Sequence, residues 1–267
     1  MLAFAKGLAM QAGAMLRQAQ SGPLDVRHKG PGDLVTRMDL AAERIIVEAI
    51  RARYPDHAIL TEEAGALPAS APAPASAPAS PTYRWLVDPL DGTVNYAHRW
   101  PHWAVSLGLE REGELVLGVV YAPVCGELYW AEKGRGAYLD GRPLRVSEVG
   151  EARSALLAIG SVASDGDRPL RDQPAGRLGG EVMKVRQTGV CSLDLCWLAA
   201  GRIDALFQGR STPWDVAAGM VMVAEAGGRV TKPGGLPLAV EDPSFLASNG
   251  ALHEELVRVL SWPQEYR

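Results

Sequence analysis

Residues 88–93 read Asp88-Pro89-Leu90-Asp91-Gly92-Thr93, and they follow directly on the segment Arg84-Trp85-Leu86-Val87. The apolar segment predicts a strand that ends at Asp88, after which Pro89 fixes the backbone and Gly92-Thr93 can open a helix. Two carboxylates and the Leu90 carbonyl then converge within one turn, beside a helix N-terminus. Hard divalent cations prefer such oxygen ligands, and phosphate binds helix-terminal N–H groups. The hexapeptide therefore predicts a site for a divalent cation and a phosphate.

The same six residues also fit a capped turn, because Asp-Pro and Asp-Gly are common turn dipeptides. Acids elsewhere favour the metal site: Glu62 follows a short apolar run, Asp215 opens a predicted helix, and Asp39 begins another. Asp39 and Asp215 are equally good helix N-caps. Clustered carboxylates repel one another unless a cation lies between them. The pattern alone leaves both interpretations open, since it does not show that these acids converge.

Composition places the chain among ordinary globular proteins. It has 267 residues, of which 47% are hydrophobic and 22% charged, enough for one large domain or two packed halves. The net charge of −4 provides no general attraction to nucleic acid or to an anionic membrane. No stretch approaches the ~20 apolar residues that cross a bilayer. Lys6, Gln11 and Arg17 interrupt the apolar start, which argues against a signal peptide, so we expect a cytoplasmic protein.

Several other site classes lack their motifs. The three cysteines, Cys125, Cys191 and Cys196, have no CxxC spacing, so neither a disulfide framework nor a zinc site is indicated. The five histidines show no HExxH pattern, and no GxSxG, GxGxxG or GxxxxGK[ST] motif is present. Serine-type hydrolysis and the common nucleotide-binding loops therefore have no support.

The hydrophobic pattern predicts a mixed α/β (α+β) fold. Helices are expected at the amphipathic start and over residues 39–53, 192–200, 216–226 and 252–260. Strands are expected over residues 58–60, 84–87, 104–110, 115–122, 127–131, 155–159, 182–187 and 205–207. Residues 28–33 are rich in glycine and proline and predict a mobile loop, whereas the Pro/Ala/Ser tract 66–82 predicts a disordered insertion. We divide the chain into an α+β half, 1–150, and an α/β half, 151–267.

Four segments carry a resemblance to the inositol monophosphatase family. These segments are Asp33-Leu34-Val35-Thr36-Arg37-Met38-Asp39, Leu60-Thr61-Glu62-Glu63, Asp88 to Thr93, and Trp214-Asp215-Val216-Ala217-Ala218-Gly219. The resemblance itself extends over almost the whole chain outside residues 66–82. The resemblance implies a layered αβαβα sandwich, a homodimer, and a phosphatase that uses two to three Mg²⁺ ions, with Mn²⁺ as a substitute.

The resemblance also implies a role for each matching position. The metal ligands would be Glu62, Asp88, the carbonyl of Leu90, Asp91 and Asp215. The catalytic group would comprise Thr93, hydrogen-bonded to Asp39 to orient the attacking water, together with Glu62 and Asp91. The substrate contacts would come from Gly92 and Thr93, whose N–H groups hold phosphate, and from Gly189, Cys191, Gln208 and Asp215. Most metal ligands thus belong to residues 1–150, while residues 151–267 contribute Asp215 and substrate contacts.

The implied reaction is hydrolysis of inositol 1-phosphate to inositol and phosphate by metal-activated water. The segment Val94-Asn95-Tyr96-Ala97-His98-Arg99-Trp100-Pro101 resembles the inositol monophosphatase branch. Gln208 stands where inositol phosphatases commonly have a glutamate that binds substrate hydroxyls. The same chemistry on fructose 1,6-bisphosphate, histidinol phosphate or 3′-phosphoadenosine 5′-phosphate is the alternative. A further alternative is a non-catalytic binding protein of the same fold. The complete set of metal-ligand positions argues against it. The expected partner is a small phosphate ester, without nucleic acid or membrane.

Overall fold

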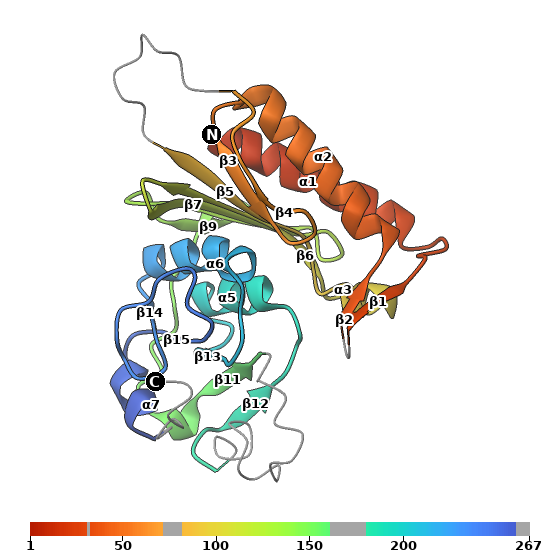
Figure 1. Ribbon diagram of the computed structural model, residues 1–267. Helices are drawn as coiled ribbons and strands as arrows, with labels where there is room; N and C mark the ends of the chain where they lie inside the picture. The colour runs from red at the N-terminus through yellow and green to blue at the C-terminus, as the bar shows by residue number, and fades with distance from the viewer. Residues whose placement is uncertain (31–32, 72–81, 161–179, 260–267) are drawn as a thin grey trace.

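The computed structural model describes residues 1–30, 33–71, 82–160 and 180–259. Two long helices, α1 (Leu2–Ala19) and α2 (Arg37–Arg53), form an outer layer over one sheet (Figure 1). In α1 the residues Leu8, Ala12 and Leu16 repeat at helical spacing and are buried. The helix α2 is capped by Thr36, whose hydroxyl accepts a hydrogen bond from the N–H of Met38. Both predicted helices are confirmed, with α2 beginning two residues before the predicted start.

The larger sheet has eight strands. From one edge to the other they are β10 (Arg142–Pro143), β9 (Ala137–Leu139), β8 (Glu127–Glu132), β7 (Glu114–Ala122), β6 (Ala104–Arg111), β5 (Tyr83–Asp91), β3 (Ala58–Thr61) and β4 (Gly65–Leu67). Neighbours pair antiparallel except β3 and β5, which are parallel. The predicted meander of β6, β7 and β8 is confirmed. Because β3 and β5 run in the same direction, their carboxyl ends meet at one edge of the sheet.

The smaller sheet has five strands, in the order β12 (Lys184–Arg186), β11 (Leu156–Ile159), β13 (Ala205–Gln208), β15 (Phe245–Ser248) and β14 (Arg229–Thr231). Helices α5 (Cys191–Ala199) and α6 (Pro213–Glu225) lie between the two sheets, and one core cluster joins them to both. On the far face, α7 (His253–Val259) and the short η1 (Ala152–Ser154) cover the smaller sheet. Figure 1 shows the resulting αβαβα order of layers, so the predicted sandwich is confirmed.

Helix α6 packs unusually close to the larger sheet because two strand positions lack side chains. A Cβ atom on Gly118 of β7 would lie 2.3 Å from the carbonyl oxygen of Ala218, and one on Gly108 of β6 would lie 2.6 Å from the Cβ of Ala217. Real side chains do not tolerate such distances, so both glycines are required by this packing. The close approach brings the first turn of α6, which contains Asp215, to the end of β5.

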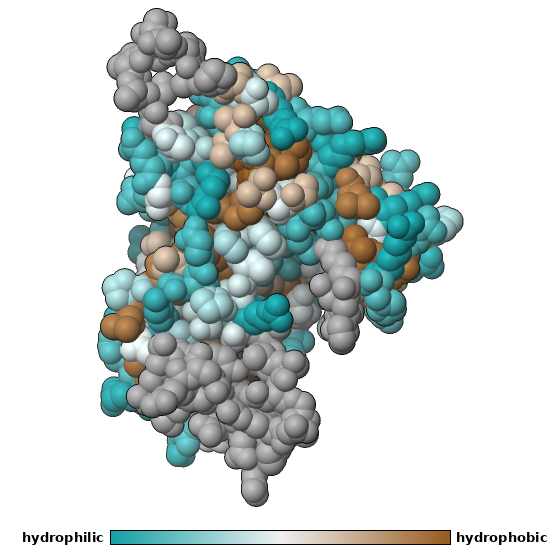
Figure 2. Space-filling model, in the orientation of Figure 1, coloured by the Kyte–Doolittle hydropathy of each residue, from teal (hydrophilic) through white to brown (hydrophobic). Residues whose placement is uncertain are grey.

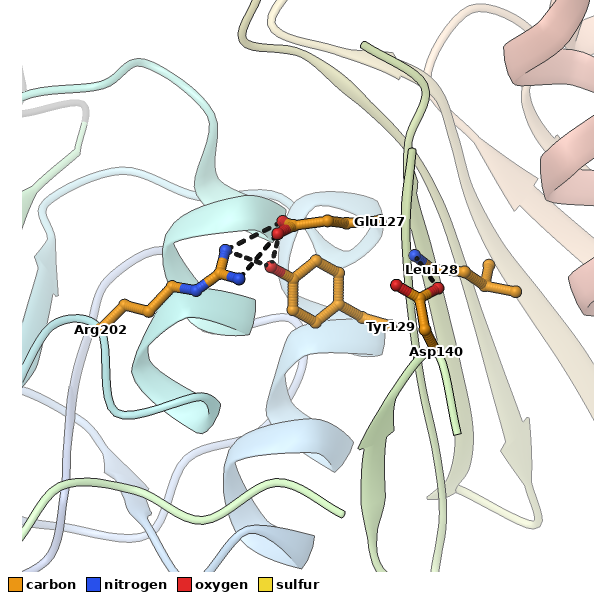
Figure 3. Close-up of polar contacts among 5 residues, drawn as sticks. All are labelled: Glu127, Leu128, Tyr129, Asp140 and Arg202. Carbon is orange, nitrogen blue, oxygen red and sulfur yellow. Dashed lines mark hydrogen bonds and ion pairs between the residues drawn. The ribbon is translucent and has the colours of Figure 1, made fainter. Parts of the chain in front are cut away.

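A polar contact away from that edge also links the segment after α5 to the larger sheet. Figure 3 shows Arg202, which follows α5, directed at Glu127 and Tyr129 of β8. Its two terminal nitrogens donate to both carboxylate oxygens of Glu127, at 2.9 and 2.7 Å, and Tyr129 donates to the same carboxylate at 2.6 Å. The hydrogen bonds from Arg202 lower the pKa of Glu127. A bidentate pair of this kind fixes orientation as well as distance.

Two loop predictions need correction. Residues 27–30 form β1 (Arg27–Gly30), which pairs antiparallel with β2 (Asp33–Val35), so the predicted loop over 28–33 is wrong at its ends. The Gly30-Pro31-Gly32 sequence is typical of a hairpin connection, and residues 31–32 themselves lie outside the described residues.

The tract 66–82 is likewise ordered at its start, where β4 pairs with β3. The backbone N–H groups of Ser70 and Ala71 then donate to the carbonyl of Pro55, each at 2.9 Å. Strand pairing uses main-chain groups, which side-chain composition does not reveal. The prediction of a disordered insertion is therefore wrong for these residues, and 72–81 lie outside the described part of the chain.

The surface is polar over most of its outer face. Figure 2 shows hydrophilic residues covering most of the outer helical layer, with hydrophobic residues in small separate patches. Within the described ranges, no helix combines the length and apolar character that crossing a membrane requires. Single exposed apolar residues are normal on globular proteins and indicate no particular partner.

Candidate active site

The site is built on the carboxyl end of β5. Between Asp88 and Asp91 the pairing with β6 shifts register, which produces a bulge that contains Pro89 and Leu90. The Leu90 N–H donates to Asp88 Oδ1 at 3.0 Å, and both carboxylates are buried, with exposures of 2% for Asp88 and 8% for Asp91. The strand thus continues to Asp91, beyond the predicted end at Asp88. The bulge brings both acids and the Leu90 main chain to one edge of the sheet.

Gly92 is required by both conformation and space. Its φ of 93° lies in the left-handed region, where side chains are strained, and a Cβ would stand 2.8 Å from Cγ2 of Val190. The chain then enters the short helix α3 (Thr93–Ala97), which confirms the predicted helix start. Gly92 therefore permits the sharp change from strand to helix and the close approach of Val190, which precedes α5.

Asp39 and Thr93 are brought together from different elements. Thr93 Oγ1 donates to Asp39 Oδ1 at 2.8 Å, and the Leu90 carbonyl is a second acceptor at 3.1 Å. The other oxygen of Asp39 accepts from the N–H and the hydroxyl of Thr36, at 2.8 and 2.6 Å. Asp39 is therefore both the third-residue partner of Thr36 in the capping box of α2 and the partner of Thr93. The prediction of Asp39 as an N-cap is wrong by three positions, because the N-cap is Thr36, and the predicted role of Asp39 in orienting water stays a prediction.

Asp215 at the start of α6 likewise takes part in capping a helix while it lines the cavity described below. It is the third helical residue and forms a capping box with Thr212, whose N–H donates to Asp215 Oδ2 at 3.0 Å. Asp91 caps the remaining inter-sheet helix, since its Oδ2 accepts from the N–H of Ser192 at 2.7 Å. The interpretation of Asp91 as a helix cap is confirmed, although the donor belongs to α5 rather than to α3, and its role as a metal ligand stays a prediction.

One cavity of about 180 Å³ collects these groups. It is lined by Leu34, Glu62, Asp88, Leu90, Asp91, Gly92, Thr93, Val94, Gly189 and Asp215. Every predicted metal-ligand position lies on it, as do the predicted phosphate-binding positions Gly92 and Thr93. Asp39 lies behind Thr93. Cys191 and Gln208 are absent from the lining among the residues that the structure describes.

The buried acids strongly disfavour their own ionisation. Burial, reinforced by the charge of Asp215, raises the pKa of Asp91 to about 8, and burial raises the pKa of Asp215 to about 6. The pKa of Asp88 is raised by burial and by the charges of Glu62, Asp91 and Asp215. Burial is the largest cause of each shift, and repulsion between neighbouring carboxylates adds to it at Asp88 and Asp91. A cation among them would remove that repulsion.

The donor set fits a hard divalent cation. The cavity offers carboxylate oxygens and the main chain of Leu90, without a histidine or thiol in its lining among the described residues. No three acidic, histidine or cysteine side chains in the described ranges form a ready-made cluster around one point. Mutually repelling carboxylates tend to turn apart, so binding would draw these side chains together. The chemistry of the donors suits Mg²⁺ or Mn²⁺ rather than zinc.

The loop that carries Gly189 is anchored on both sides. Asn95 of α3 donates from Nδ2 to the carbonyls of His102, at 2.9 Å, and Thr188, at 3.0 Å. Thr188 Oγ1 lies 2.8 Å from each carboxylate oxygen of Asp194 on α5, and burial raises the pKa of Asp194 to about 7. The loop is thereby tied both to the segment that follows Gly92 and to α5.

Two predicted substrate contacts are enclosed by protein. Cys191 begins α5 and is buried, and burial beside the site acids raises the pKa of its thiol. Gln208 ends β13 with 4% of its surface exposed, and its Nε2 donates to the carbonyl of Arg210 at 2.8 Å. Gly160 lies directly against the Gln208 amide. Their roles toward a substrate stay predictions.

Sequence reasoning missed three supporting residues: Glu43, Asn95 and Asp194. Glu43 lies on α2 four residues after Asp39, and it is buried although charged. An acid on the apolar face of an amphipathic helix is a detectable signal for it. Asn95 and Asp194 give no comparable signal, because their partners are main-chain carbonyls and a threonine in loops.

The layered fold and the oxygen-only donor set are those of the metal-dependent phosphatases. Residues 1–263 match the inositol monophosphatase family, and the chain therefore belongs to that family of phosphatases.

Its relatives carry different names. Inositol monophosphatase 2 of Solanum lycopersicum is 37% identical over 257 residues, which cover 95% of each chain. Nus factor SuhB of Escherichia coli (strain K12) is 38% identical over 241 residues, which cover 86% of this chain and 84% of that protein. The solved structure of an inositol monophosphatase from Anabaena (Nostoc) sp. PCC 7120 is 35% identical. The superposition covers 97% of this chain and 94% of the Anabaena chain, with a TM-score of 0.83.

Proposed function

We propose that this chain is a Mg²⁺-dependent phosphomonoesterase that hydrolyses inositol 1-phosphate to inositol and phosphate. The observation that carries the proposal is the single cavity lined by Glu62, Asp88, Asp91 and Asp215, with Thr93 beside them. The name of the tomato relative supports the substrate, and the Anabaena structure supports it through the shared fold.

The four carboxylates and the Leu90 carbonyl would hold two to three Mg²⁺ ions, with Mn²⁺ as a substitute. When bound, the ions would neutralise the phosphate, lower the pKa of a water and stabilise the departing alkoxide. The chain's own residues do the rest. Thr93 donates its hydroxyl hydrogen bond to Asp39, so a lone pair on Thr93 Oγ1 is free to accept a hydrogen bond from the attacking water. The N–H groups of Gly92 and Thr93 bind the phosphate oxygens.

Substrate hydroxyls would be held by the Gly189 loop, by Asp215, and by Cys191 and Gln208 after local adjustment. An amide at Gln208 holds polyol hydroxyls without a charge, which gives less selectivity than a carboxylate. The competing substrates are fructose 1,6-bisphosphate, histidinol phosphate and 3′-phosphoadenosine 5′-phosphate. The family resemblance also leads us to propose a homodimer, which light scattering on the purified protein tests.

The decisive experiment is a substrate panel with the purified protein. Phosphate release is measured with Mg²⁺, with Mn²⁺ and with EDTA, and the Asp91→Asn variant serves as the control for contaminating phosphatases. We expect the highest kcat/KM for inositol 1-phosphate and no turnover in EDTA. A higher value for another phosphate would reassign the substrate. Absence of metal-dependent release from every compound would leave a non-catalytic binding protein of this fold.

A further inference from the structure

Helix α2 carries two buried acids on one face. Asp39 and Glu43 have exposures of 0% and 7%, and residues four apart on a helix lie one above the other. Asp39 contacts Thr93, as described above. Glu43 contacts a different part of the site, the turn between β3 and β4.

Glu43 accepts three hydrogen bonds on one oxygen. Its Oε2 lies 2.7 Å from Thr61 Oγ1, 2.9 Å from the N–H of Glu63 and 3.3 Å from the N–H of Ala64. A buried carboxylate is costly unless donors surround it, and here the donors all come from one segment. Thr61 is itself fully buried, so this contact is shielded from water.

The donors of Glu43 belong to the end of β3 and to the turn that follows it. Strands β3 and β4 pair through Thr61 and Gly65, which leaves Glu62-Glu63-Ala64 as a three-residue turn. The N–H groups of Glu63 and Ala64 therefore lie outside the ladder, and Glu43 accepts from both. Its donors stand immediately before Glu62 and in the two positions after it.

We propose that Glu43 is a positioning residue that holds the segment around Glu62, through the Thr61 hydroxyl before it and two main-chain N–H groups after it, so that the Glu62 carboxylate is held where the metal binds. This assignment rests on the proposed metal-dependent function. Because Asp39 and Glu43 share one rigid helix, α2 also sets the separation between the Thr93 hydroxyl and the Glu62 turn. A shift of α2 would move both together.

The test compares two matched glutamates. Glu43→Gln keeps the side-chain size but replaces the anionic acceptor by an amide, one end of which is a donor. The control is Glu225→Gln, because Glu225 on α6 likewise accepts two loop N–H groups, those of Gly134 and Gly136, each at 2.8 Å. It lies at the opposite end of α6 from Asp215 and is not among the described residues that line the acidic cavity. Thr61→Val removes one donor and serves as a milder second variant.

The first readout is Mn²⁺ binding to the substrate-free protein, measured by electron paramagnetic resonance, beside the melting temperature in EDTA. Loss of such a supporting contact typically weakens metal affinity or activity by about 10–100-fold. We expect weakening of that order in Glu43→Gln, a smaller one in Thr61→Val, and wild-type binding in Glu225→Gln. Excess Mg²⁺ should restore turnover in Glu43→Gln, since the defect is in affinity.

Equal Mn²⁺ affinity in wild type and Glu43→Gln, with a lowered melting temperature, would overturn the assignment and leave Glu43 as a structural residue. If Glu43→Gln does not fold, Thr61→Val decides by the same comparison. A wild-type protein that binds no Mn²⁺ would instead overturn the metal site itself, and the assignment with it. The two failures are therefore distinguishable.

Discussion

The hydroxyl of Thr93 donates a 2.8 Å hydrogen bond to the carboxylate of Asp39, although 54 positions separate the two residues. A threonine hydroxyl has one proton, and the Leu90 carbonyl is the longer alternative acceptor, at 3.1 Å. Because the other oxygen of Asp39 is held by Thr36, the carboxylate cannot rotate away from Thr93 without breaking the cap of α2. The pair is thus oriented by the helix itself, and the hydroxyl remains at the wall of the cavity.

Replacing Thr93 by alanine tests whether this hydroxyl activates water. We expect kcat to fall by ~10²–10⁴-fold, the usual loss when general-base assistance is removed. KM should change less, since the missing contact matters mainly in the transition state. Mn²⁺ binding should survive, because every carboxylate remains. Thr93→Ser is the matched control and should keep most activity. If Thr93→Ala is nearly as active as the wild type, Thr93 is only part of the helix start.

Asp91→Asn should separate stability from activity. The pKa of Asp91 is raised to about 8 by burial and by Asp215, so the charged side chain opposes folding in the absence of metal. Asparagine keeps an oxygen that can accept from Ser192. We therefore expect a higher melting temperature than wild type in EDTA, weaker Mn²⁺ binding and loss of turnover. A lower melting temperature in EDTA would show that the Ser192 contact outweighs the relief of repulsion.

Asn95→Ala should loosen the loop that carries Gly189. The variant removes both amide hydrogen bonds, to His102 and Thr188, while leaving every metal ligand in place. We expect a raised KM with unchanged Mn²⁺ affinity, as measured by steady-state kinetics and metal titration. Asn249→Ala is the control, because its amide nitrogen also bridges two partners, Ser147 and Val149, and none of the three is among the described residues that line the acidic cavity. A KM that rises equally in both variants would point to general destabilisation.

The sequence predicted the long periodic elements well. The helices α1 and α2 and the meander of β6, β7 and β8 follow from hydrophobic spacing within each segment, which is local information. The strands β14 and β15 were missed. Both are short, and the register of β15 depends on β13, about forty residues earlier in the chain. β4 was missed for a related reason, since its pairing with β3 is made by the main chain.

The site residues also fall into those that one segment predicts and those that depend on contacts between distant segments. The acids at Asp88 and Asp91 were predicted from one segment, and their convergence with Asp215 needed the family resemblance. The sequence does not predict the close packing that brings Asp215 to the other acids. This packing depends on Gly118, where a side chain would collide with α6. Nor could sequence decide between cap and ligand for Asp215. The structure shows that a capping box uses one of its oxygens while the residue still lines the cavity.

A separate prediction concerns His253, which is fully buried at the start of α7. Its Nε2 lies 2.8 Å from Thr231 Oγ1, and its Nδ1 lies 2.8 Å from Ser248 Oγ. Thr231 donates its own proton to the carbonyl of Lys232, so it must accept from Nε2–H. Ser248 accepts from the N–H of Gly250 and can donate to Nδ1. The neutral Nε2–H tautomer therefore satisfies every partner, whereas a proton on Nδ1 would require the Ser248 hydroxyl to turn its own proton to another acceptor.

Burial, with the nearby charge of Arg229 added and that of Glu254 opposing, lowers the pKa of His253 from 6.5 to about 4. Between these values the unfolded chain binds a proton that the native protein does not, so this stabilisation is complete above pH 6.5 and is lost as the pH falls toward 4. His253→Gln cannot titrate. In urea unfolding we expect the variant to be less stable at pH 7.5, and its deficit to shrink between pH 6.5 and 4. Other titrating groups cancel in that difference. A deficit that stays constant with pH would mean that His253 titrates alike in the folded and unfolded chains.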